Sequence, residues 1–132
     1  MVFPMPNANL PHDHGQGIEQ ELQNMPSVEN FQTVADIFKQ LGDGSRIRIF
    51  WLLCHCEECV INISAIVDMS SPAVSHHLRQ LKNGGLITSR RVGKEVYYKA
   101  ADTQQARLLH HVIEELVEIT CPDCAGVHEH GE

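Results

Sequence analysis

The sequence lacks the features of a membrane protein and of a secreted protein. No apolar run approaches the roughly 20 residues that a membrane-spanning helix needs, so no membrane partner is expected. The first Lys or Arg is Lys39, and Pro4, Pro6 and Pro11 interrupt the start of the chain, so the basic beginning of a secretory signal is missing. These absences predict a cytoplasmic protein, whose five cysteines are thiols or metal ligands rather than structural disulfides.

Aromatic residues are also scarce. They make up 5% of the 132 residues and include a single tryptophan. Hydrophobic residues nevertheless reach 42% and charged residues 20%, which are values of a globular protein rather than of a disordered one. A chain of this length has room for one domain with a modest core.

The net charge of −7 at first argues against a nucleic-acid partner. Its distribution reverses that interpretation, because residues 44–100 carry eight Lys or Arg against four Asp or Glu, while both flanking segments are acidic. Residues 70–100 hold six basic side chains against Glu95 alone. A basic centre between acidic ends is typical of a nucleic-acid-binding surface, although an ordinary solvated surface also carries such charges.

Hydrophobic spacing and turn residues predict one domain at residues 27–120, between a flexible N-terminal arm at 1–26 and a tail at 121–132 that contains Cys and His residues. Ser71 is the expected N-cap of the fourth helix and Asp102 that of the last one. Helices are expected from Ser27 to Leu41, across Ile47–Cys54, from Asn62 to Val67, from Pro72 to Asn83 and from Asp102 to Thr120, and strands at Leu86–Arg91 and Glu95–Ala100.

This order of elements is that of a winged helix-turn-helix, so the expected fold class is mainly α with a small β-hairpin. In such a fold one helix presents its polar face to base edges in the DNA major groove, while a basic hairpin reaches the phosphates. Winged helices also serve as protein-interaction modules, so the pattern alone leaves a role without DNA open. The side chains expected to face bases are Ser75, His76, Arg79 and Gln80. Those expected to face phosphates are Ser71, Lys82, Arg90, Arg91 and Lys94.

Three stretches resemble the ArsR/SmtB family of metalloregulatory repressors: Phe38–Leu53, Ser71–Ile87 and Arg91–Tyr98. They are similar to that family's second helix, recognition helix and wing, and the resemblance covers about residues 28–120. It implies a homodimer that is held by its first and last helices, binds double-stranded operator DNA and is released by an inducer. The small aromatic content fits a core that a partner chain completes.

Three cysteines, Cys54, Cys56 and Cys59, lie within six residues. Thiolates bind soft or borderline cations, and ligands on one short loop converge at little entropic cost. A small buried hydrophobe is a sufficient role for Cys54 alone, but not for all three cysteines beside His55 and two glutamates. We therefore expect a thiophilic inducer ion, namely zinc, cadmium, lead or arsenite. Weaker candidate ligands are His12, His14, His110 and His111.

Cys121 and Cys124 form a second chelating pair. We expect them to add ligands to the same site, within or across protomers; the alternative is a tail with its own weak metal affinity. The family's thiolate sensors carry Cys-Val-Cys where the third helix begins, whereas here Ile61 follows Cys59 and Val60. The family's histidine-rich zinc site on the last helix is expected to be absent. At its positions this chain has Asp102, Gln104, Glu115 and Glu118.

The sequence thus predicts a DNA-binding transcriptional repressor, not an enzyme, that a thiophilic ion releases from its operator. One alternative is a repressor of the same fold that senses thiol oxidation or persulfides through pairs of cysteines. Another is a thiol oxidoreductase or metal-handling protein without a DNA function. The oxidoreductase is disfavoured because Cys121-Pro-Asp-Cys124 follows a helix, whereas in thioredoxin-type enzymes the motif follows a strand and opens a helix.

Overall fold

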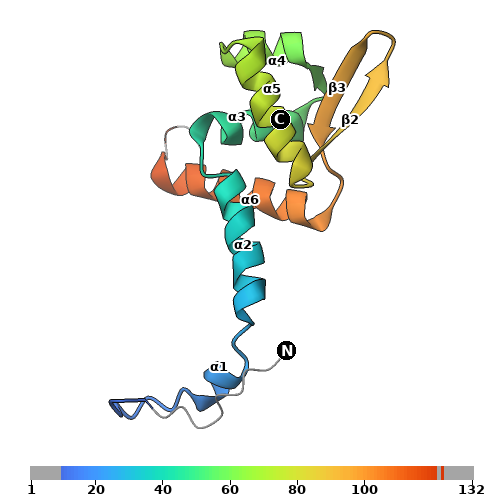
Figure 1. Cartoon of the computed structure of the whole chain (residues 1–132). Helices are drawn as coiled ribbons and strands as arrows, with labels where there is room; N and C mark the ends of the chain where they lie inside the picture. Colours follow the sequence, from blue (N-terminus) through green and yellow to red (C-terminus); the bar gives the residue numbers. More distant parts are fainter. Residues whose placement is uncertain (1–9, 122, 124–132) are drawn as a thin grey trace. The chain divides into compact units, whose positions relative to one another are not determined.

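The computed structural model describes residues 10–121 and 123, and the chain divides into two compact units, Met1–Lys39 and Gln40–Glu132 (Figure 1). The boundary between the units falls inside the domain expected at residues 27–120. Within the described residues, no helix is both long enough and apolar enough to cross a membrane.

The first unit holds α1 (Glu19–Gln23) and most of α2 (Val28–Gln40). Ser27 accepts a hydrogen bond from the backbone N–H of Asn30 at 3.1 Å and so caps α2, as its side-chain chemistry predicts. The short helix α1 lies within the segment expected to be an arm, at 1–26. Two acidic residues in its first turn stabilise it by interacting with the positive end of the helix dipole. α2 has an apolar stripe that is exposed by 48% to 67%, made of Val28, Phe31, Val34 and Phe38.

The second unit contains a helix-turn-helix and a wing (Figure 1). The helices α4 and α5 form the helix-turn-helix, and β2 and β3 form an antiparallel hairpin beside them. The predicted fold class, mainly α with a small β-hairpin in a winged helix-turn-helix, is confirmed. The elements of this unit are α3 (Gly44–His55), β1 (Glu58–Cys59), α4 (Val60–Val67), α5 (Ser71–Asn83), β2 (Ile87–Val92), β3 (Glu95–Ala100) and α6 (Gln104–Thr120).

The strand β1 is an addition to the predicted hairpin. It pairs antiparallel with β3, with Glu58 opposite Tyr98 and Cys59 opposite Tyr97, and gives a sheet of order β1-β3-β2. From the sequence this stretch is expected to be a loop, because two residues are too few to show the alternation of a strand. The cysteine-containing segment is therefore the edge of the wing's own sheet.

The hydrophobic core of the second unit is built around α3. Ile49, Phe50 and Leu53 on this helix are at most 2% exposed. The helix that carries them contacts α4, α5, β3 and α6. The other large side chains that are fully buried come from the helix-turn-helix and the start of β2, and they are Ile63, Val74, Leu78, Leu81, Leu86 and Ile87.

Helix starts differ from the predicted caps by one or more residues. Ser70, rather than Ser71, caps α5 by accepting a backbone N–H three residues on, at 3.3 Å. Thr103, rather than Asp102, caps α6 in the same way at 3.1 Å. α4 begins at Val60 rather than at the predicted start, Asn62, which therefore lies inside the helix. Neighbouring side chains share the chemistry of a cap, and the extended backbone that an N-cap needs falls on Ser70 and Thr103.

Candidate DNA-binding surface and inducer site

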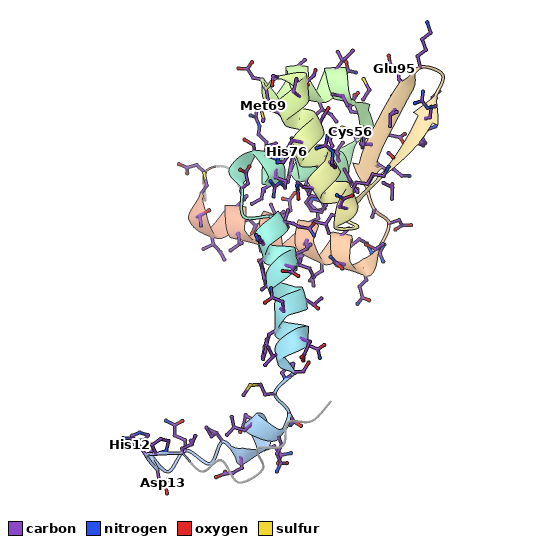
Figure 2. The ribbon with its side chains drawn as sticks, in the orientation of Figure 1. His12, Asp13, Cys56, Met69, His76 and Glu95 are labelled. Carbon is purple, nitrogen blue, oxygen red and sulfur yellow. The ribbon has the colours of Figure 1, made fainter. Side chains whose placement is uncertain are left out.

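The helix α5 has one polar face and one buried face. His76, which lies on α5 (Figure 2), and Arg79 are exposed, whereas Ser75 and Gln80 are half-buried. These are the four residues predicted to face bases. On the opposite face, the side chains that are buried as expected are Val74, Leu78 and Leu81.

A buried histidine, His77, connects α5 to the start of α3. The Nε–H of Arg46 donates a hydrogen bond to Nδ1 of His77 at 3.2 Å. The same guanidinium donates from Nη1 to the carbonyl oxygen of Gln40 at 3.0 Å. On the other side of the imidazole ring, a carboxylate oxygen of Asp43 lies 4.0 Å from Nε2. These contacts hold α5 against α3.

The surroundings of His77 favour its neutral form. Burial lowers the pKa of His77 below its ordinary value of 6.5; the charges of Arg46 and His76 also lower it, while Asp43 raises it. The neutral ring also fits the hydrogen bond, because Nδ1 must carry a free lone pair to accept the proton of Arg46.

The wing presents Arg91 and Lys94 to solvent around the turn between β2 and β3. Gly93 makes this turn with a positive φ of 64°, a conformation that suits glycine. Glu95 begins β3 at the tip of the wing (Figure 2). Both basic residues are exposed, and their contact with phosphate stays a prediction.

Arg90, on β2, is held by an acidic partner that lies between two of the cysteines. Its guanidinium donates two hydrogen bonds to the carboxylate of Glu57, at 2.6 and 2.8 Å, and it lies 5.7 Å from the ring centroid of Tyr97. The hydrogen bonds lower the pKa of Glu57 and raise that of Arg90. A residue predicted to contact phosphate is therefore occupied by a carboxylate in this form of the protein.

The other two predicted phosphate contacts also bond within the chain. Lys82 donates from Nζ to the hydroxyl of Ser89 at 2.8 Å, which connects α5 to β2. The hydroxyl of Ser71 lies 3.2 Å from that of Ser64. Both residues remain exposed, so both stay available to a phosphate.

The structure places the three clustered cysteines on different elements, and all three are free thiols. Cys54 lies on α3, and Cys56 is the C-cap residue directly after this helix. Cys59 is buried in β1 and precedes α4. Burial and then the charge of Glu114 raise the pKa of Cys54 to about 12. Burial and Glu58 raise the pKa of Cys56. In the absence of a metal, these two thiols are protonated at neutral pH.

A pocket of about 440 Å³ adjoins two of these thiols. Its walls come from α3, the segment after it, β3 and α6, and they include Cys54, Cys56, Glu57, Asp102 and His110. The three sulfur atoms do not form a group with ligand atoms within 4.8 Å of one another in the described part of the chain. Of the second chelating pair, Cys121 is disulfide-bonded and offers no thiolate in this form, and Cys124 lies outside the described residues.

Another group of potential ligands does meet this distance. It is formed by His55, His110 and Glu114 at the contact of α3 with α6. From the sequence alone, His110 is expected only as a weak candidate ligand and Glu114 is missed. The spacing of four residues between them is a usable signal, because it puts both side chains on one face of a helix. Of the other candidate histidines, His12 stacks on His14 within the first unit, and His111 lies 3.4 Å from Glu115 within α6.

Comparison with known proteins identifies the family. Residues 43–89, which run from the cap of α3 into β2, match the family described as "Bacterial regulatory protein, arsR family". Over 114 residues, the chain is 36% identical to a protein of Synechocystis sp. named transcriptional repressor SmtB homolog, and the match covers 86% of each chain. The chain belongs to the arsR family.

Other arsR-family relatives are named for resistance to toxic ions. The cadmium resistance transcriptional regulatory protein CadC homolog of Staphylococcus aureus is 39% identical over 82 residues, which are 61% of this chain and 68% of the relative. The arsenic resistance transcriptional regulator ArsR2 of Pseudomonas putida is 38% identical over 68 residues, or 51% and 59% of the two chains. The relatives are transcriptional regulators and not enzymes, as the sequence predicts for this chain.

Solved structures show the same fold. A homodimeric winged helix-turn-helix DNA-binding domain from Mycobacterium bovis superposes with a TM-score of 0.62 at 29% identity, over 71% of this chain and 89% of that chain. HlyU from Vibrio cholerae superposes with a TM-score of 0.63 over 68% of this chain and 97% of that chain. At 22% identity, the likeness to HlyU concerns the fold alone.

The environment of His77 predicts a loss of stability in acid. Its folded-state pKa lies below the ordinary value of 6.5, so the unfolded chain binds the proton more readily. The free energy of unfolding should therefore fall as the pH drops below about 6.5 and should level off once folded His77 is protonated too. Urea titrations of wild type and of His77→Gln between pH 7.5 and about 5 measure this effect. A decline of the same size in both proteins would contradict the assignment to His77.

Proposed function

We propose that this arsR-family chain is a cytoplasmic, homodimeric repressor that binds operator DNA and leaves it when a thiophilic ion binds at Cys54, Cys56 and Cys59. The observation that carries the proposal is the ion pair between Glu57 and Arg90. It connects the cysteine segment with the basic wing through two hydrogen bonds of 2.6 and 2.8 Å.

The DNA-binding half of the proposal rests on the two exposed basic elements of an otherwise acidic chain. The polar face of α5 has the width and chemistry to enter a major groove, and Arg79 is its exposed guanidinium. Arg91 and Lys94 on the wing lie at the phosphate backbone in this arrangement. The partner is therefore double-stranded DNA with a specific operator sequence.

The dimer is supported by apolar side chains that one protomer leaves in solvent. On α6, Leu108, Leu116 and Ile119 are 58%, 52% and 70% exposed. α2 adds the exposed stripe described above. Surfaces of this kind on one chain are typical of an interface, and the winged helix-turn-helix domain of M. bovis is homodimeric. We assign both helices to the interface between two copies.

The inducer is proposed to be zinc, cadmium, lead or arsenite, because thiolates favour such ions. Cys54 and Cys56 line one pocket, and Cys59 follows three residues after Cys56 on the adjoining strand. Only Glu57 and Glu58 separate Cys56 from Cys59, and Glu58 belongs to β1, so a shared ion requires a local rearrangement of this segment. Cys121 and Cys124, once reduced, are proposed as additional ligands. The names of the relatives, which refer to cadmium and arsenic resistance, fit this class of ion.

Competition for Arg90 explains how the ion lowers the affinity for DNA. A carboxylate and a phosphate both take two hydrogen bonds from a guanidinium, so Arg90 binds either Glu57 or DNA. An ion held by Cys56 and Cys59 fixes the segment that contains Glu57 and thereby keeps Arg90 away from the phosphate. By linkage, the ion must then bind the free dimer more tightly than the DNA complex, by about 1–3 kcal/mol for a typical allosteric pair.

The first test separates base contacts from phosphate contacts. Arg79→Ala should reduce the preference for operator over random DNA, by about 1–3 kcal/mol if its guanidinium reads a base. Arg91→Ala should weaken binding to both DNAs and reduce the log–log salt slope by about 2 per dimer, because each of the two protomers loses one phosphate contact of about 0.9. Fluorescence anisotropy at several salt concentrations measures both quantities. Equal affinity of the reduced wild type for operator and random DNA would refute the repressor function.

The second test concerns the thiols. Cys56→Ser/Cys59→Ser should bind operator like wild type but should no longer be released by cadmium, lead, zinc or arsenite under a reductant. Cys121→Ser/Cys124→Ser should lose less of the response if this pair only supplements the site. Release of metal-free protein by an oxidant or a persulfide, reversed by a reductant, would instead establish the redox-sensing alternative. If neither treatment releases the operator, the cysteines are not the switch.

The third test concerns the competition for Arg90. Glu57→Gln should tighten operator binding, by roughly two- to fivefold for an exposed ion pair, and should reduce the factor by which the ion weakens it. Glu58→Gln is the matched control, because it removes the same charge one residue away, where the carboxylate accepts a hydrogen bond from Asn62 rather than from the wing. Anisotropy with and without cadmium measures both effects. Identical behaviour of the two variants would show that charge alone acts, and not the ion pair.

A further inference from the structure

We propose that His55, His110 and Glu114 bind one divalent transition-metal ion of borderline softness, such as Zn²⁺, in each protomer. This site requires no sulfur ligand and shares no ligand with the proposed thiolate site, although His110 lines the same pocket as Cys54 and Cys56. Its atoms are Nε2 of both histidines and Oε2 of the glutamate, and they come from the end of α3 and the middle of α6.

The distances between these three atoms are those of a tetrahedral zinc site. His110 Nε2 lies 3.2 Å from His55 Nε2 and 3.1 Å from Glu114 Oε2, and His55 Nε2 lies 3.5 Å from the same oxygen. Zn–N and Zn–O bonds of about 2.0–2.2 Å at tetrahedral angles place neighbouring ligand atoms about 3.3–3.5 Å apart. An ion therefore fits among the three atoms with shifts of a few tenths of an ångström.

The fold orients each ligand through contacts around the site. His110 and Glu114 are four residues apart and share one face of α6. The ring of His55 packs on Trp51, with centroids 4.2 Å apart, and meets the edge of the His110 ring at 4.9 Å. The indole Nε1–H of Trp51 donates to Glu114 Oε2 at 2.9 Å. Such a hydrogen bond to a ligating carboxylate is the outer support that metal sites use.

The site is also accessible and has suitable charge. The side chains of His110 and Glu114 are about three-tenths exposed, and that of His55 is 45% exposed, so water can supply the fourth ligand. His110 lines the pocket between α3 and α6, which provides an entry path. Two neutral imidazoles and one carboxylate form the donor set that zinc, cobalt(II) and nickel(II) accept, whereas cadmium, lead and arsenite favour thiolates. The chain thus offers two neighbouring sites of different chemistry.

Cobalt(II) is a suitable probe, because a tetrahedral site gives it intense visible absorption. The full-length protein with all five cysteines changed to serine should bind one Co²⁺ per chain with this spectrum, and Zn²⁺ should displace it. In the same background, His110→Gln and Glu114→Gln should each weaken Zn²⁺ binding at least about tenfold. His111→Gln and Glu115→Gln are matched controls, because this pair has the same spacing on the same helix but joins no three-ligand group within the described residues, and they should leave the affinity unchanged.

The result that overturns the proposal is a cysteine-free, folded protein that binds no Co²⁺ or Zn²⁺, or one whose affinity is the same in His110→Gln, Glu114→Gln and the two controls. If the cysteine-free variant does not fold, reduced wild-type protein decides the question. Dialysed against Zn²⁺, the wild type should then retain one more ion per chain than His110→Gln does, as measured by elemental analysis. An equal zinc content in these two proteins likewise overturns the site.

Discussion

The buried face of α3 is the constraint on which the rest of the second unit depends. Ile49, Phe50 and Leu53 are almost fully removed from solvent, and the helix that carries them contacts α4, α5, β3 and α6. Burying side chains of this size contributes about 1.5–3 kcal/mol each, so the position of α3 is strongly fixed. Three features depend on this helix: Arg46 near its start holds α5, His55 at its end belongs to one candidate metal site, and Cys56 directly after it belongs to the other.

The acidic chain exposes a basic surface, and one basic side chain of that surface is paired with a carboxylate of the same chain. Arg79, Arg91 and Lys94 are exposed, whereas Arg90 is paired with Glu57. In water such an exposed pair contributes little to stability. In the proposed function its importance lies in competition, because a guanidinium that binds a carboxylate is not free to bind a phosphate. The pair would then let the cysteine segment influence DNA affinity without any contact between a metal ion and DNA.

The two candidate metal sites have adjacent positions and different donors. Cys54 and Cys56 flank His55 in the sequence, yet the imidazole turns toward α6 and joins Glu114, while the two thiols line the neighbouring pocket. Cadmium, lead and arsenite favour thiolates, whereas zinc also accepts imidazole and carboxylate donors, so the two sites differ in the set of ions that they bind. An ion between α3 and α6 would add a cross-link to the scaffold that holds α5.

Local spacing in the sequence predicts the class of fold, the order of the helix-turn-helix and wing elements and the buried face of α5, whereas α1 and β1 are not predicted. The alternation of buried Val74 and Leu78 with exposed His76 and Arg79 follows from the helical period alone. The cluster of Cys54, Cys56 and Cys59 is also visible as a local pattern, although its role as a ligand set remains a prediction.

Which distant residues meet depends on the tertiary structure. The cap of α5 falls on Ser70 instead of Ser71, because the path of the chain, and not side-chain chemistry, sets where the extended residue stands. Glu57 reaches Arg90 across 33 residues because β1 pairs with the wing, and this strand is too short to be recognised from the sequence. His55 meets Glu114 across 59 residues because the hydrophobic faces of α3 and α6 pack together. Local periodicity predicts such faces but not their register, which is fixed only when side chains from both helices fill one core.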